Sequence, residues 1–170
     1  YPLGSEGPDA LEEEQVSTIG EHVFYLNFSG ASDLVKINLG ESFETRYNFF
    51  TNLDPNKWVS GVKASKELTL TNIYPGIDLR LYSAAGGALE FDWIIAPGSD
   101  FNQIKMNFIG QDKLKIEKDG QLKVKLRFTD LFFHIPESYQ LTEKGKVPVT
   151  LNFDLKGKDD VGFISKDKID

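Results

Sequence analysis

Three acidic side chains are the first residues whose type and spacing suggest chemistry. Glu90 and Asp92 lie two positions apart in the segment LEFDW, so both point to one face of an extended strand. Asp78, in the apolar run before them, is placed to lie opposite across a hairpin. Glycoside hydrolases use two carboxylates held a fixed distance apart, which gives an enzymatic interpretation. The pattern favours the alternative, a solvated sheet face on which Arg80 neutralises the acids across strands.

Acidic residues at turns are the candidate metal ligands. Asp54, Asp78 and Asp100 each lie at or beside a turn signal. Calcium requires clustered oxygen ligands, but Asp in a turn also bonds to its own backbone. Because the sequence has no acidic loop of the EF-hand kind, bound Ca²⁺ remains the weaker hypothesis and no cofactor is expected.

Aromatic residues at predicted turns and strands are the candidate binding residues. Trp58, Tyr74 and Tyr82 could stack on sugars if they were exposed, whereas packing in the core is the alternative use of Trp58. The two histidines, His22 and His134, lie in no recognisable triad or zinc pattern, and cysteine is absent. We therefore assign no catalytic residue and expect a protein that is not an enzyme.

The elements that position these residues are strands. Residues 77–82 and 89–95 alternate apolar and polar side chains and are separated by small residues, which predicts a central hairpin. Residues 22–28 and 35–39 predict a second hairpin, and Asp119-Gly120 between two alternating runs predicts a third, with a type I′ turn. Residues 41–61 contain many aromatics without a sustained period and predict a long connection.

The same alternation continues to the end of the chain. Further strands are expected around residues 66–73, 104–108, 131–135, 139–141, 147–155 and 161–164. About ten strands with turns every eight to twelve residues predict an all-β fold, a mainly antiparallel two-layer β-sandwich that is jelly-roll-like or Ig-like.

Length and charge define the broad class. A chain of 170 residues is long enough for one domain with its own core. We expect a lead-in or linker over residues 1–20, the sandwich over 21–164 and a charged tail over 165–170 that leads to a following module. The net charge of −7 disfavours nucleic acid as a partner, and no apolar run is long enough to span a membrane.

The order of several motifs resembles a known family. YNFFTNLDPNKW is followed by NIYPGIDLRLYSAAGGALEFDWIIAPGSDFNQIKMNFIGQDKLKI. Together they resemble an N-terminal domain of unknown function found in large secreted bacterial surface proteins. The chain departs from the family pattern at residues 52–55, where NLDP has one extra residue, and at Ser99, where Ala is usual.

The resemblance implies a context as well as a fold. In such proteins the domain accompanies β-propeller-type (SBBP) repeats, Ig-like or PKD modules and C-terminal sorting or gliding-motility-associated domains. It implies an extracellular, non-catalytic structural or interaction module whose partners are neighbouring modules of the same parent protein. A carbohydrate-binding module that contacts extracellular glycans is the second hypothesis, and a carboxylate glycosidase is the third.

Overall fold

The computed structural model describes residues 20–51, 53–84 and 87–169, and all of its extended elements are antiparallel strands. Two short 3₁₀ helices, η1 (Pro55–Lys57) and η2 (Phe101–Gln103), are the helical elements of the described residues. The strands are β1 (Tyr25–Phe28), β2 (Lys36–Leu39), β3 (Ser42–Phe49), β4 (Val59–Ser65), β5 (Glu67–Tyr74), β6 (Ile77–Ser83), β7 (Leu89–Ile95), β8 (Met106–Ile109), β9 (Lys113–Ile116), β10 (Leu122–Lys125), β11 (Asp130–Phe133), β12 (Ser138–Thr142), β13 (Gly145–Val149), β14 (Leu151–Leu155) and β15 (Asp160–Ser165).

The strands of the described residues form five sheets. One four-stranded sheet has the order β2-β5-β6-β7 and a second has the order β1-β8-β15-β14. The three-stranded sheet β11-β10-β9 completes the second layer, and β12-β13 and β3-β4 are two-stranded sheets. The predicted all-β, antiparallel class is confirmed, although the described residues contain fifteen strands and not about ten, because residues 42–65 add two strands and the run over residues 147–155 is divided into two.

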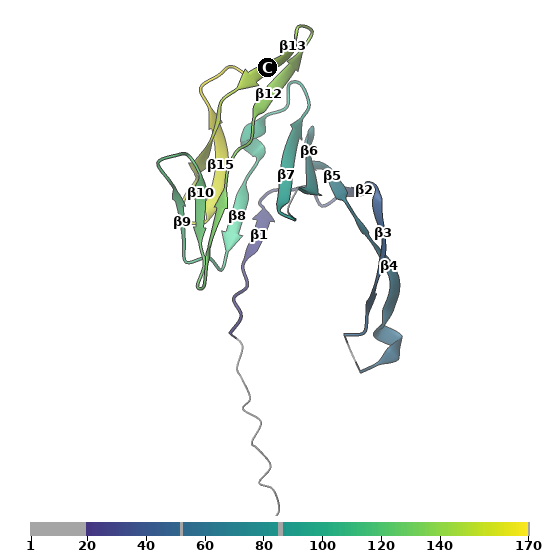
Figure 1. The fold of residues 1–170 in the computed structure, drawn as a ribbon. Coiled ribbons are helices and arrows are strands. Elements are labelled where there is room, and N and C mark those ends of the chain that lie inside the picture. The colour runs from purple at the N-terminus through teal and green to yellow at the C-terminus, as the bar shows by residue number, and fades with distance from the viewer. Residues whose placement is uncertain (1–19, 52, 85–86, 170) are drawn as a thin grey trace, which may run out of the picture.

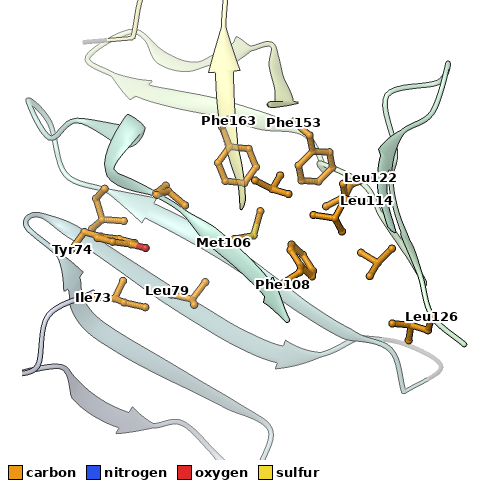
Figure 2. Close-up of a cluster of buried hydrophobic side chains, with 14 residues drawn as sticks. Ile73, Tyr74, Leu79, Met106, Phe108, Leu114, Leu122, Leu126, Phe153 and Phe163 are labelled. Carbon is orange, nitrogen blue, oxygen red and sulfur yellow. The ribbon is translucent and has the colours of Figure 1, made fainter. Parts of the chain in front are cut away.

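The core lies between the β2-β5-β6-β7 sheet and the strands of the second layer (Figure 2). Ile77 and Leu79 on β6 face Met106 and Phe108 on β8, and all four side chains are fully buried. Aromatic rings extend this packing, since Phe91 on β7 lies 6.3 Å from Phe133 on β11 between ring centroids. Burial of this continuous apolar surface is the main force that holds the layers together.

The central hairpin is confirmed, but Asp78 pairs with Ile94, so its expected position opposite Glu90 and Asp92 is wrong. Ile77 pairs with Ile95 and Ser83 with Leu89, so the predicted strands align end to end. The turn before it has two residues, Pro75 and Gly76, and Gly76 has a φ of 71°. Proline followed by a positive-φ glycine is what a type II turn requires. The alternation places Glu90 and Asp92 on the outer face, as expected, although Leu89 is largely exposed.

A two-stranded ribbon leaves this sheet (Figure 1). We use "the ribbon" for residues 42–65, which comprise β3, η1 and β4. It continues the β2–β5 ladder, because Gly40 N–H donates to Glu67 O at 3.0 Å and Lys66 N–H donates to Glu41 O at 2.8 Å. The prediction of a long connection over residues 41–61 is therefore wrong, and two register shifts between β3 and β4 explain why the sequence shows no sustained period there.

The predicted pairing of residues 22–28 with 35–39 is also wrong. β1 pairs with β8 and β2 pairs with β5, so the two segments belong to different sheets. The turn after β1 instead carries the chain from one layer to the other, and Ser32 N–H donates to Ile73 O at 2.8 Å. The turn chemistry was visible in the sequence, but the choice of partner depends on non-local contacts.

Two details near the C-terminus differ from expectation. The β9–β10 hairpin forms, but Gly120 alone has a positive φ in its turn and its N–H bonds to Glu117 O, so it is a type I turn with a G1 bulge and not type I′. The run over residues 147–155 is divided at Thr150 into β13 and β14.

The charged tail expected over residues 165–170 is attached to the domain in its described part. Asp167 Oδ2 accepts from Thr150 N–H at 2.6 Å, and Gln140 Nε2 donates to Lys168 O at 3.0 Å. The lead-in expected over residues 1–20 lies outside the described residues except for Gly20.

Candidate functional site

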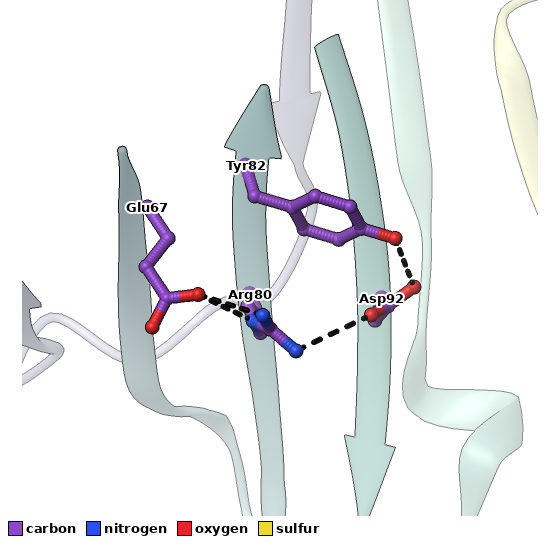
Figure 3. A network of polar contacts seen from close by, with 4 residues as sticks. All are labelled: Glu67, Arg80, Tyr82 and Asp92. Carbon is purple, nitrogen blue, oxygen red and sulfur yellow. Dashed lines mark hydrogen bonds and ion pairs between the residues drawn. The ribbon is translucent and has the colours of Figure 1, made fainter. Parts of the chain in front are cut away.

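Asp92, one of the three acids that suggested chemistry, lies in an ion-pair network on the outer face of the central sheet (Figure 3). Arg80 on β6 is the centre of this network, and its guanidinium donates twice to Glu67 Oε2, at 3.0 and 2.7 Å. Asp92 is its cross-strand partner at 4.0 Å and also accepts from Tyr82 Oη at 3.3 Å. The favoured interpretation of Asp92, neutralisation by Arg80 across strands, is confirmed.

The carboxylates of this network stabilise the protonated forms of Arg80 and Tyr82. The hydrogen bond to Glu67 is the largest cause that raises the pKa of Arg80. Desolvation raises the pKa of Tyr82, with smaller contributions from the carboxylates of Glu90 and Asp92 beside it. Both shifts favour the protonated forms, so neither side chain is prepared to act as a base. Two open depressions of about 250 and 330 Å³ lie elsewhere on the molecule, and neither is lined by Glu90 or Asp92.

The acids at turns bond to backbone. Asp54 accepts from Asn56 N–H and caps η1, and Asp100 accepts from Asn102 N–H and caps η2, each at 3.0 Å. The two bonds from Asn102 lower the pKa of Asp100. Asp78 accepts from Asn72 N–H at 2.7 Å and holds a bulge in β5 at which Asn72 has a φ of 55°.

These three carboxylates therefore lie at three separate places. Among the residues that the structure describes, no three His, Asp or Glu side chains gather in a group that could hold a metal ion.

The three candidate binding aromatics do not form one platform. Tyr74 is 2% exposed and belongs to the core, where its hydroxyl lies 3.2 Å from Ser29 O and 3.3 Å from Lys105 O and N. Its proposed role as a sugar-stacking residue is wrong because its ring is covered. Tyr82 lies on the outer sheet face with Arg80 over its ring at 4.9 Å, and Trp58 lies on the ribbon.

The ribbon is the feature that sequence reasoning missed. Tyr47 pairs with Val62 and Phe49 with Val59, and strand alternation places all four side chains on one face. The opposite face is polar: Arg46 pairs with Lys63, Arg46 donates to Gly61 O, and Asn48 Oδ1 accepts from Gly61 N–H. We call Tyr47, Phe49, Val59 and Val62 the apolar ribbon face.

Strand alternation relates this face to the inner face of the sheet, with Lys66 in the bend between β4 and β5 interrupting the apolar row. Counting by twos along β5 and β4 from the inward-facing Leu68 leads to Val62. On the neighbouring strand, Ile37 and Leu39 also belong to the inner face, but they are 65% and 67% exposed because the second layer does not extend over β2. We call this pair the ledge.

The ledge and the ribbon form a candidate contact site because their large hydrophobic side chains are exposed. Tyr47 and Phe49 are each 48% exposed, and Trp58 lies beside Phe50 at the ribbon's end with ring centroids 5.1 Å apart. The exposed large hydrophobic residues of residues 34–59 are Leu34, Ile37, Leu39, Phe43, Tyr47, Phe49, Phe50, Leu53, Trp58 and Val59. A contiguous exposed apolar patch on a folded protein marks a contact surface. The short alternation of Arg46, Tyr47, Asn48 and Phe49 was its one sequence signal.

Comparison with known proteins places the chain in a family. A family model described as "Domain of unknown function (DUF7948)" matches residues 4–170, so the chain belongs to this family. Neither the curated proteins nor the solved structures gave a match. In the described part of the chain, no helix is long and apolar enough to cross a membrane.

Proposed function

We propose that this domain is a non-catalytic structural or interaction module of an exported cell-surface protein, and that the ribbon is the element with which it contacts another protein module. The observation that carries the proposal is the apolar ribbon face, which is half-exposed on an otherwise ordinary folded domain. The motif resemblance to surface proteins with repeats supports the extracellular context, in which the domain helps to display or fold its neighbours.

The physical argument concerns a two-stranded ribbon without a second layer. An isolated hairpin is marginally stable in water because it cannot bury its apolar side chains. The ribbon has one anchored end, where Gly40 and Lys66 continue the β2–β5 ladder, and beyond that point its contacts are mainly those between its own strands β3 and β4. A second surface over Tyr47 and Phe49 would complete the local sandwich and order the ribbon.

Hydroxyl-radical footprinting tests this proposal even while the partner is unidentified. The isolated domain, at high dilution, is compared with the intact parent protein. We expect oxidation of Tyr47, Phe49 and Trp58 to fall several-fold in the parent protein, while exposed Phe132 on β11 serves as the control. Equal oxidation of the ribbon aromatics in both samples would overturn the proposal.

Carbohydrate binding remains the second candidate, and Trp58 is the observation in its favour because its indole is partly exposed beside Phe50. Calorimetry of the isolated domain against a glycan panel separates the two. Micromolar affinity that is lost in Trp58→Ala and kept in Tyr82→Phe would favour the glycan. Turnover of a polysaccharide that Glu90→Gln abolishes would overturn both non-catalytic proposals.

A further inference from the structure

The partner that best fits the ribbon is a second copy of this chain. We infer that two copies associate about a two-fold axis with their apolar ribbon faces packed against each other, so that the end of each ribbon covers the ledge of the other. This inference rests on the proposed function, since it names the module that the ribbon contacts.

The first argument is self-complementarity. A two-fold interface needs one patch that can face itself, with residues at its two ends exchanged between copies. The ledge, Ile37 and Leu39, lies at one end of the exposed face, Phe49 and Val59 lie at the other, and Tyr47 lies between them. When the two faces pack antiparallel, the end of each ribbon that carries Phe49 therefore covers the ledge of the other copy. Tyr47 of each copy then lies near the two-fold axis. The product is a two-layer sandwich of four strands, the arrangement that two amphipathic ribbons require.

The second argument is area. Aromatic side chains bury about 150–250 Å² each when fully covered, and aliphatic side chains bury less. Six large hydrophobics lie on or beside the face at roughly half exposure and offer on the order of 500 Å² per copy: Ile37, Leu39, Phe43, Tyr47, Phe49 and Val59. Stable complexes bury about 800 Å² per partner. The patch alone therefore supplies most of the area that a stable dimer needs.

The third argument is charge. The whole chain carries −7, but residues 33–66 contain five basic and four acidic side chains and carry +1. The acidic remainder of each copy would lie away from the axis, and charges separated by more than about 8 Å are largely screened at physiological salt. Arg46 and Lys63 lie on the polar ribbon face, which stays in water when the apolar faces meet. The contact region, at +1 per copy, therefore adds little like-charge repulsion of its own.

Sedimentation equilibrium of the 170-residue chain is the first test. We expect a monomer–dimer equilibrium with a dissociation constant on the order of micromolar. Tyr47→Ser combined with Phe49→Ser should abolish the dimer, and Phe132→Ser, which removes an equally exposed aromatic on β11, should leave it unchanged. An unchanged thermal midpoint in the dilute double variant shows that it is folded. Leu39→Ser, at the opposite end of the face, is a second variant that should also weaken the dimer.

Disulfide trapping tests the two-fold geometry, because the chain has no cysteine of its own. Tyr47→Cys should oxidise to a covalent dimer at concentrations at which Phe132→Cys stays monomeric. A monomer at every soluble concentration, a dimer that survives the double variant, or equal cross-linking at both positions would overturn the inference. If the ribbon is protected in the parent protein while the domain is monomeric, the second copy is excluded and the proposed function stands. If it is unprotected, the proposed function itself fails.

Discussion

The ribbon and the β5–β6–β7 part of the central sheet are both paired antiparallel and are joined by the hydrogen bonds of Gly40 and Lys66, yet their apolar side chains differ in burial. Leu79 on β6 is covered on its inner face by the second layer and is fully buried, whereas Phe49 on β3 has comparable hydrophobicity and remains half-exposed. Hydrogen bonding is similar, since both are antiparallel pairs with register shifts. The difference is the presence of a packing layer, which shows that pairing alone does not bury a strand.

The largest expected effect compares truncation in the two regions. Leu79→Ala should lower the free energy of unfolding by about 3–4 kcal/mol, because it removes buried contacts and leaves a cavity. Phe49→Ala in dilute protein should cost less than about 1 kcal/mol, because much of the ring is already in water. Urea denaturation monitored by tryptophan fluorescence measures both. Equal losses would mean that the ribbon is packed as tightly as the sheet.

A glycine in the turn before β6 gives the next largest effect. Gly76 has a positive φ, and a methyl group added there would lie 2.0 Å from Ser99 Oγ. Gly76→Ala should therefore cost about 2–3 kcal/mol, from backbone strain and displacement of Ser99 together. Gly98→Ala is the matched control, because Gly98 has a φ of 77° and open space around it. It should cost about 1 kcal/mol, from strain alone.

The buried phenol predicts a pH dependence that the ribbon does not share. Desolvation raises the pKa of Tyr74 in the fold, and the Lys105 N–H bond offsets this in part. Because the pKa of Tyr74 in the fold exceeds the unfolded value of about 10, the stabilisation that the neutral phenol contributes is complete below the unfolded pKa. This stabilisation is lost as the pH rises through the folded pKa.

Tyr74→Phe tests this dependence. It should cost about 1–2 kcal/mol at neutral pH through lost hydrogen bonds. It should also flatten the decline in stability at alkaline pH, as thermal unfolding across the range would reveal. An unchanged alkaline decline in Tyr74→Phe would assign that decline to other groups.

The smallest effect belongs to the ion pairs of the outer face. Arg80 and Glu67 are 42% and 36% exposed, so solvent screens their attraction. Glu67→Gln should change the free energy of unfolding by less than about 1 kcal/mol. Glu90→Gln, on the same face, should change it by less still, and a larger loss in denaturant titrations at either position would indicate a buried or functional charge.

The sequence was sufficient where local signals and burial agreed. Alternation and Pro75-Gly76 predicted the two strands of the central hairpin, and Arg80 was predicted to neutralise the acids of that face across strands. The register was not predicted, since Asp78 pairs with Ile94 and not with Glu90 or Asp92. Asp-Gly likewise predicted the β9–β10 hairpin, although the turn type differs because Asp119 does not adopt a positive φ.

Prediction failed where the outcome depends on distant partners. Nothing local shows that β1 pairs with β8, because that choice depends on contacts between segments about 80 residues apart in the sequence. Tyr74 follows a strand at a turn, a position that suggests exposure, yet the second layer covers it. The ribbon was missed for a local reason. Two register shifts between β3 and β4 break the alternation of apolar and polar side chains in the sequence, although the two strands still pair.

The central claim is that the ribbon is a paired but uncovered extension of a covered sheet. Native-state hydrogen exchange of the dilute domain tests it most directly, because exchange reports local opening. We expect the amides of β3 and β4 to exchange orders of magnitude faster than those of β6 and β8, and to slow as the concentration rises while β6 and β8 stay unchanged. Ribbon amides that exchange in dilute protein as slowly as those of β6 would contradict the claim.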